Sequence, residues 1–164
     1  MSKTEQHLKD AFAGESQANR KYLAYSKKAE QEGYKQAAKL FRAAAAAETI
    51  HAHNHLRELG VVKSTKENLK DAINGESYEF QKMYPQMIVD AKAEGYDGAL
   101  RSFNLANEVE KVHAALYRKA LDSMSKDAVT DCYVCSVCGY TVEGHAPDEC
   151  PVCKAKKQAF MKVE

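Results

Sequence analysis

No cysteine occurs before residue 132, and no apolar stretch is long enough to cross a membrane. The N-terminus lacks the apolar segment of a signal peptide. The net charge is only +1, so electrostatics gives no reason to expect nucleic acid or an anionic membrane as a partner. These absences predict a cytoplasmic protein, in which crowded cysteine pairs indicate metal ligation more than disulfides.

The 164 residues predict one main domain with a small appendage. Four amphipathic helical patterns fill residues 1–122, a polar linker is predicted over 123–131, and a short segment rich in cysteine and glycine covers 132–164. Gly60 is expected to end the second helix, and Pro85 is expected to kink or interrupt the third. Capping pairs are predicted at two helix starts, Ser2 with Glu5 and Ser64 with Glu67.

The helical region contains an internal repeat. Three motifs recur in both halves: Gly14-Glu15-Ser16 and Gly75-Glu76-Ser77, Glu32-Gly33-Tyr34 and Glu94-Gly95-Tyr96, and Glu48-x-x-His51 and Glu110-x-x-His113. A carboxylate and an imidazole three residues apart lie on one face of a helix. Two such helices, with two more that each present an inward Glu, form the ligand set of a four-helix di-iron carboxylate site.

Acidic residues occupy positions on the apolar helix faces where leucine is expected. They are Glu15, Glu48, Glu76, Glu79 and Glu110. A lone Glu on a helix is usually solvated, but burying several unpaired carboxylates together would cost several kcal/mol each. Two divalent cations would nearly neutralise them. Oxygen ligands with two imidazoles suit iron or manganese.

The C-terminal segment contains two CxxC pairs separated by 11 residues, Cys135 with Cys138 and Cys150 with Cys153. This spacing predicts a tetrahedral four-thiolate site for zinc or iron, and the spacing alone does not choose between them. So short a segment cannot build an adequate apolar core, so the metal is expected to drive its folding. Cys132 is expected to be a free thiol.

Taken together, these motifs resemble the rubrerythrin family over nearly the whole chain. CxxCGY and CPxC resemble rubredoxin knuckles, and Glu76-x-x-Glu79 resembles the extra carboxylate that separates rubrerythrin sites from the simpler bacterioferritin type. The resemblance implies an all-α, four-helix ferritin-like bundle followed by a rubredoxin-like domain. Lys154 departs from rubredoxins, which usually have glycine there, and this leaves open the hydrogen bonding around the nearby sulfur.

The resemblance also implies a role for each ligand. Glu48 and Glu110 would bridge two irons, Glu15 and Glu79 would bind one, and Glu76 and His113 the other. Glu79 and His51 would exchange as ligands when the redox state changes. Tyr22 and Tyr84 match tyrosines that line the family's site, where they would either hydrogen-bond ligand carboxylates or simply pack in the core.

The implied activity is reduction of hydrogen peroxide to water. Electrons would pass through the four-cysteine iron from a separate NAD(P)H-dependent reductase, because the chain has no dinucleotide-binding fingerprint. By family analogy, the four-cysteine iron serves the di-iron site of another subunit, so a homo-oligomer is expected. The alternatives are a ferroxidase or iron-handling protein, and a binding protein whose cysteine module is a zinc ribbon.

The joint between the repeats is short. Ferritin-like bundles run the second and third helices parallel, so their connection must travel roughly 30 Å for a 20-residue helix. The connection from Gly60 to Ser64 spans at most ~18 Å. We therefore hypothesise that subunits exchange helix pairs, with partial unwinding of residues 63–70 as the alternative.

Overall fold

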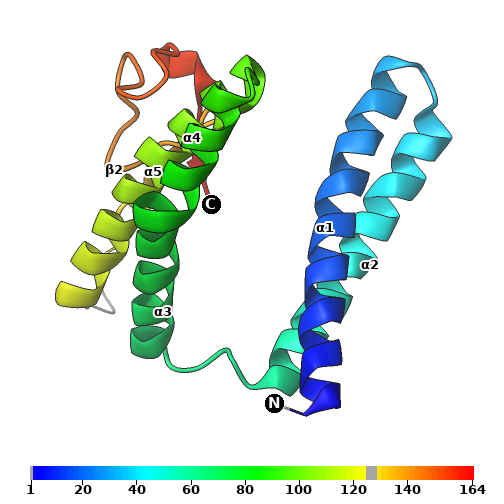
Figure 1. Ribbon diagram of the computed structural model, residues 1–164. Helices are drawn as coiled ribbons and strands as arrows, with labels where there is room; N and C mark the ends of the chain where they lie inside the picture. The colour runs from blue at the N-terminus through cyan, green and yellow to red at the C-terminus, as the bar shows by residue number, and fades with distance from the viewer. Residues whose placement is uncertain (1, 125–128) are drawn as a thin grey trace. The chain divides into compact units, whose positions relative to one another are not determined.

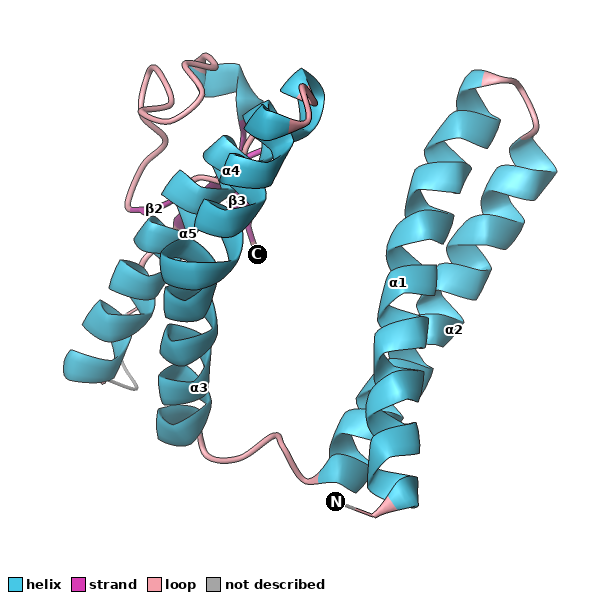
Figure 2. Cartoon of the chain, viewed as in Figure 1, coloured by secondary structure: helices cyan, strands magenta, loops and turns pink. Residues whose placement is uncertain are grey.

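The computed structural model describes residues 2–124 and 129–164, which form five α-helices and a small sheet (Figures 1 and 2). The helical elements are α1 (Lys3–Gln31), α2 (Lys35–Leu59), α3 (Thr65–Tyr78), the π-helix η1 (Glu79–Met83), α4 (Tyr84–Ala93) and α5 (Asp97–Asp122). The C-terminal elements are β1 (Cys132–Cys135), β2 (Thr141–Glu143), the 3-10 helix η2 (Lys157–Ala159) and β3 (Phe160–Val163). Residues 125–128 of the predicted linker lie outside the described residues.

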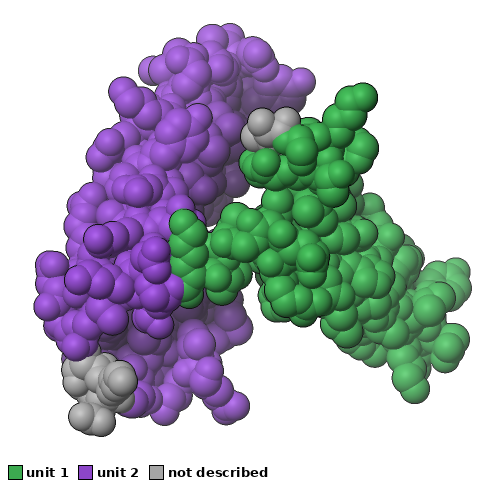
Figure 3. All heavy atoms as spheres, turned by 90° about the horizontal axis from the view of Figure 1, so that it is seen from below, with its two compact units in different colours: residues 1–63 green, residues 64–164 purple. Residues whose placement is uncertain are grey.

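The chain divides into two compact units, residues 1–63 and 64–164 (Figure 3). In the first, α1 and α2 pack along a seam of small side chains, and the buried residues are Ser26, Ala29, Ala38, Ala45 and Ala52. The Asn19 amide donates a hydrogen bond of 2.7 Å to the Ala45 carbonyl across this seam. Small side chains let the two helices approach closely but bury little apolar surface.

The repeated Glu-Gly-Tyr motif ends a helix in the same way in both units. Gly33 and Gly95 adopt positive φ values of 85° and 72°. The following amide, of Tyr34 or Tyr96, bonds back to the carbonyl five residues earlier at 2.8 or 2.9 Å. These bonds form a Schellman motif, which needs a residue that tolerates the left-handed region. The repeat therefore encodes a matched helix hairpin in each unit.

The joint between the repeats has the predicted boundaries. Gly60 caps α2 in the left-handed conformation, and Ser64 forms a full capping box with Glu67 at the start of α3. Ser2 accepts a hydrogen bond from the Glu5 amide at the start of α1. Because α3 is helical from Thr65, the unwinding of residues 63–70 considered above does not occur.

Pro85 interrupts the third helix, as predicted. The segment Glu79–Met83 takes up one extra residue as a π-helix, and α4 then continues with proline near its start. A π-helical turn shifts the register of the side chains that follow, and such turns are frequent at functional sites. Here it begins at Glu79, one of the predicted ligands.

The C-terminal module is a three-stranded antiparallel sheet in the order β2-β1-β3. Its small core includes the edge-on pair Tyr140 and Phe160, with ring centroids 6.3 Å apart, and the buried Cys135 and Cys150. None of the helices among the described residues has the length and apolar character needed to cross a membrane.

Candidate metal centres

In the first unit, Glu15 of α1 lies beside Glu48 and His51 of α2. One ligand atom from each of these three residues lies within 4.8 Å of the others. His51 Nδ1 is 3.0 Å from a Glu48 carboxylate oxygen, as expected for a pair three residues apart on one helix. The His51 side chain is 54% exposed.

The second unit repeats this arrangement with Glu76 of α3 and with Glu110 and His113 of α5. His113 Nδ1 lies 2.7 Å from Glu110 and 3.8 Å from Glu76. All three residues are half-buried. Each unit therefore carries one carboxylate–carboxylate–imidazole cluster, and six of the seven predicted bundle ligands lie in these two clusters.

The seventh predicted ligand, Glu79, is not among the clustered ligand atoms of the second unit. Its ionisation is nevertheless affected by this cluster. Burial raises the pKa of Glu79, and the negative charge of Glu110 raises it further. Burial, and then a hydrogen bond and charge repulsion from Glu110, raise the pKa of Glu76 to about 7. Without a cation, this carboxyl group keeps its proton up to a pH well above its usual pKa.

The two predicted tyrosines lie in different surroundings. Burial and then the nearby carboxylates Glu79, Glu110 and Glu76 raise the pKa of Tyr84, which places its hydroxyl group in their field. Tyr84 also packs on Phe103, with ring centroids 6.2 Å apart. Tyr22 packs with Tyr25 and Phe41 at 6.3 and 6.2 Å.

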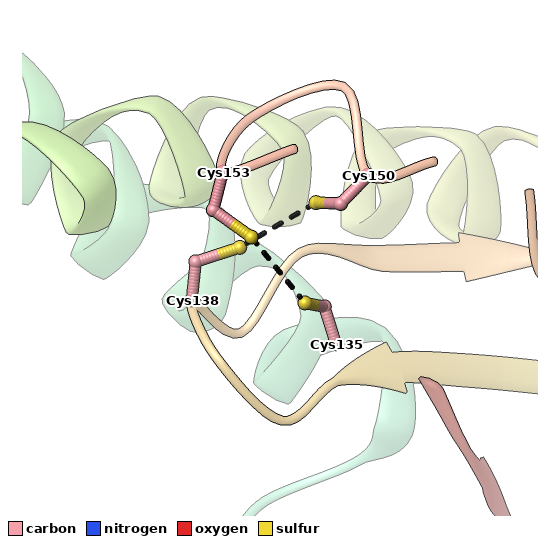
Figure 4. Close-up of side chains that lie close together, drawn as sticks. All are labelled: Cys135, Cys138, Cys150 and Cys153. Atoms are coloured by element: carbon pink, nitrogen blue, oxygen red, sulfur yellow. Dashed lines mark hydrogen bonds between the residues drawn. The ribbon is translucent and has the colours of Figure 1, made fainter. Parts of the chain in front are cut away.

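The four cysteines Cys135, Cys138, Cys150 and Cys153 point their sulfur atoms toward one another (Figure 4). Two sulfur pairs, Cys135 with Cys153 and Cys138 with Cys150, are separated by 3.6 Å. This is too long for a disulfide. It is close to the ~3.8 Å between sulfurs that a tetrahedral metal with ~2.3 Å bonds requires. Cys132 lies outside this group as a free thiol.

The two knuckles have the same backbone turn, although one has glycine and the other lysine. Gly139 has φ 86° and Lys154 has φ 64°. Their amides bond to the Cys135 and Cys150 carbonyls at 2.8 and 3.0 Å. The next amides, of Tyr140 and Ala155, donate to the Cys138 and Cys153 sulfurs. Lys154 therefore preserves the sulfur hydrogen bonding that the sequence left open.

Amide donors and burial act in opposite directions on these thiols. Burial raises the pKa of Cys135, but amide hydrogen bonds from Val137 and Cys138, together with hydrogen bonds to the Cys153 and Cys138 thiols, outweigh it, so the pKa is lowered. Burial raises the pKa of Cys138, and also that of Cys153. Thiols whose charged form is disfavoured by burial become thiolates when a cation binds, so the cluster needs a metal for full charge compensation.

One polar residue near the second cluster carries no signal in the sequence. Thr141 of β2 places its hydroxyl oxygen 3.0 Å from His113 Nε2. A single threonine in a strand-like segment is ordinary, and only the packing of β2 against α5 brings it to His113. A Cβ atom added to Gly139 would lie 3.7 Å from Val109 Cγ1, and Lys119 forms an ion pair with Glu143. The module thus rests on α5 of its own chain.

The donor atoms fit the metals that the sequence predicts. The bundle clusters offer hard carboxylate oxygens and imidazole nitrogens, which suit iron or manganese. Burial, and then Glu110, raise the pKa of Glu76, and the positive charge of a bound cation would oppose both effects. Four thiolates at tetrahedral spacing suit iron or zinc.

Comparisons with known proteins agree with this assignment. A family model described as Rubrerythrin matches residues 6–121, and one described as Rubrerythrin, rubredoxin-like domain, matches residues 133–161. Rubrerythrin-2 of Clostridium acetobutylicum is 36% identical over 96% of this chain and 95% of its own length. Nigerythrin of Nitratidesulfovibrio vulgaris is 37% identical over 96% of this chain and 85% of its own.

Solved structures of nigerythrin are also similar to this chain. The mixed-valence state matches with a TM-score of 0.60 and 35% identity, covering 99% of this chain and 88% of the other. The fully reduced, all-ferrous state matches with a TM-score of 0.60 and 34% identity. These matches confirm the predicted fold class, and they confirm a di-iron centre with a rubredoxin-like iron site as the cofactors.

The positive φ of Lys154 leads to a prediction about the stability of the module. The left-handed region costs a non-glycine residue roughly 1–2 kcal/mol, part of which is offset by the greater freedom of glycine in the unfolded chain. We expect Lys154→Gly to stabilise the module by up to about 1 kcal/mol, measured as a higher denaturant midpoint for loss of the thiolate-to-iron absorption. The matched control, Gly139→Ala, should lower that midpoint. If Lys154→Gly lowers it instead, the lysine has a stabilising role that outweighs its backbone strain.

Proposed function

Because the chain belongs to the rubrerythrin family, we propose that it is a non-haem di-iron peroxidase that reduces hydrogen peroxide in oxidative-stress defence. One hydrogen peroxide, two electrons and two protons give two water molecules. When bound, the paired irons supply the two electrons, and the four-cysteine iron returns them one at a time. The side chains of this chain would bind these metals, and the choice of carboxylate or imidazole ligand would favour one iron oxidation state over the other.

Glu79 is the observation that carries the proposal. The first unit has Ala18 at the position that corresponds to Glu79 in the repeat. Glu79 is the first residue of the π-helix η1. Its pKa is raised by burial and then by the negative charge of Glu110. Its oxygen ligand favours the more highly charged ferric state, whereas the His51 imidazole suits the ferrous state. A second ligand set for one metal position supports redox chemistry over iron storage.

The remaining assignments belong to the same proposal. Glu48 and Glu110 would bridge the two metals, Glu15 and Glu79 would bind one, Glu76 and His113 would bind the other, and His51 would alternate with Glu79. Tyr84, whose pKa is raised by burial and then by the carboxylates, keeps its proton and would hydrogen-bond a ligand, and Tyr22 would line the other half. The domains are residues 1–122 and 132–164, joined by 123–131. The reductant is NAD(P)H acting through a separate cytoplasmic reductase.

Rapid mixing tests the peroxidase proposal. The fully reduced protein should be oxidised faster by hydrogen peroxide than by air-saturated buffer, as followed by absorption of the ferric products. Glu79→Ala makes the two halves of the repeat alike at this position, and we expect it to remove most of the preference for peroxide. Glu108→Ala, which removes an exposed carboxylate paired with Lys111 on α5, should leave that preference unchanged.

Oxidation by air at the same rate as by peroxide would contradict the proposal and favour the ferroxidase alternative. A Glu79→Ala protein that keeps the full preference would contradict the role given to Glu79.

The metal site further requires residues from both units. Among the described residues, each unit contains one carboxylate–carboxylate–imidazole cluster, and each of these clusters has three close ligand residues. A di-iron site of the four-helix type takes ligands from four helices. The first unit contributes two of these, α1 and α2, and buries mainly alanine between them. A helix pair with so small a core needs a second helix pair to pack against.

The length of the joint supports an exchange of helix pairs between subunits of a homodimer. In a ferritin-like bundle the second and third helices are parallel, so the chain must return along the second helix. α2 has 25 residues, or about 37 Å. The joint of residues 60–64 is bounded by helices on both sides and reaches only ~18 Å. Each site therefore takes Glu15, Glu48 and His51 from one chain and the second cluster from its partner.

Complementation between damaged chains tests this exchange. We expect Glu48→Ala and Glu110→Ala homodimers to lack a functional di-iron site. When two differently tagged chains carrying these substitutions are co-expressed, the purified mixed dimer should regain one intact di-iron site, because its undamaged halves combine. Iron content per dimer and peroxide reduction are the measurements.

The control pairs Glu48→Ala with Glu15→Ala. Both lesions lie in the first unit, so every exchanged site remains damaged and no recovery is expected. If the Glu48→Ala and Glu110→Ala mixed dimer recovers no more iron than this control, the helix pairs are not exchanged.

A further inference from the structure

Lys154 occupies a strained backbone position beside the four-cysteine cluster. It directly follows Cys153 and has a φ of 64°, which makes it the one non-glycine residue with a positive φ among the residues that the structure describes. The left-handed region disfavours any residue with a Cβ atom. Gly139 forms the same turn after the first CxxC pair without this cost. The turn itself therefore does not require lysine, so the reason for lysine lies in its side chain.

The Lys154 side chain bonds back to the loop that carries two of the cysteines. Its Nζ donates a hydrogen bond of 3.1 Å to the Pro151 carbonyl oxygen. Pro151 directly follows Cys150, so this hydrogen bond ties the ammonium group to the loop between Cys150 and Cys153 (Figure 4). A carbonyl oxygen is a neutral acceptor, so it fixes the position of the ammonium group without cancelling its charge.

The other lysines of the cysteine module are each paired with a carboxylate. Within residues 129–164, three ion pairs match a lysine with an acid: Lys156 with Glu149 at 2.8 Å, Lys157 with Asp148 at 3.5 Å and Lys162 with Asp131 at 2.9 Å. Lys154 has a carbonyl partner in place of a carboxylate. It is therefore the lysine in this part of the chain whose positive charge is not matched by a bonded negative charge.

The charge of Lys154 acts close to Cys150. Glu149 directly precedes this cysteine in the chain. A hydrogen bond from Lys156 and the charge of Lys156 lower the pKa of Glu149, and the charge of Lys154 lowers this pKa further. The ammonium group of Lys154 thus influences one neighbour of Cys150 electrostatically and forms a hydrogen bond with the other neighbour, Pro151.

Reduction of the iron at the four-cysteine site adds a negative charge to that site. Four thiolates carry one net negative charge with ferric iron and two with ferrous iron. A fixed cation nearby attracts the ferrous site more strongly than the ferric site, which raises the reduction potential. The residue that corresponds to Lys154 after the first CxxC pair, Gly139, has no side chain and supplies no such charge.

We propose that Lys154 is a tuning residue whose ammonium group, held by the Pro151 carbonyl, raises the reduction potential of the four-cysteine iron. The side chain supplies a positive charge that glycine cannot, and this explains why the turn keeps a strained lysine. One electron converts ferric iron to ferrous iron, and no bond forms or breaks. A milder reductant can then load the site, although each electron leaves it with less driving force. This effect requires the four-cysteine iron but not the proposed peroxidase activity.

A redox titration of the iron-loaded full chain tests this charge effect, with the ferric thiolate absorption as the readout. Lys154→Asn and Lys154→Gly both remove the charge, and both new residues tolerate the left-handed region. Each should lower the ferrous-to-ferric ratio at a fixed potential about threefold, or by about 30 mV, because tenfold is about 59 mV for one electron. Lys154→Arg keeps the charge and should keep the native potential. Unchanged potentials in the two neutral variants, or an equal shift in Lys154→Arg, would overturn the proposal.

Salt and a charge-neutral control separate the electrostatic effect from a change in the fold. Lys154 is exposed, so raising the salt from about 0.01 M to about 1 M should shrink the difference in potential between Lys154→Asn and the native chain. The control combines Glu149→Gln with Lys156→Gln, which removes an ion pair but leaves the net charge unchanged, so its potential should stay close to native. A difference that persists in high salt, or a control that shifts as far as Lys154→Asn, would contradict the assignment. No peroxide is used, so the outcome is independent of the peroxidase test.

Discussion

Charge neutralisation on the inner faces of the helices is the constraint on which this structure depends. Five carboxylates, Glu15, Glu48, Glu76, Glu79 and Glu110, occupy positions that an ordinary helical bundle would fill with leucine. Two divalent cations supply four positive charges and bring the site close to neutrality. Burial, and then Glu110, raise the pKa of Glu76 to about 7, which favours a proton on this carboxyl group when no cation is bound. Folding, metal loading and protonation are therefore coupled in this chain.

The same dependence explains how little apolar core each part has. The seam between α1 and α2 is built from alanine and serine, and the cysteine module relies on one aromatic pair and its metal ligands. Such parts gain stability from metals and from packing against another surface. The ion pair of Lys119 with Glu143 is one such contact, between α5 and the cysteine module.

Much of this was predictable because the sequence repeats its ligands in register with its turns. The Glu-x-x-His pairs, the Gly60 and Ser64 boundaries, the interruption at Pro85 and the four-cysteine cluster all follow from local patterns and are found as predicted. The contact of Thr141 with His113 could not be predicted, because it arises from the packing of β2 on α5. The π-helix that begins at Glu79 could not be predicted from the sequence either, because a proline predicts that a helix is interrupted but not the geometry of the interruption. The left-handed Lys154 shows that a backbone conformation can persist after its usual residue is replaced.

The most direct test of the account is an anaerobic titration of the metal-free protein with iron-57(II), followed by Mössbauer spectroscopy. The account predicts three irons per chain at saturation. Two should have oxygen and nitrogen ligands and bind as a pair with release of protons, and one should have four sulfur ligands. Saturation with the sulfur-bound iron alone, or oxygen-bound iron that survives replacement of both Glu48 and Glu110 by alanine, would contradict it.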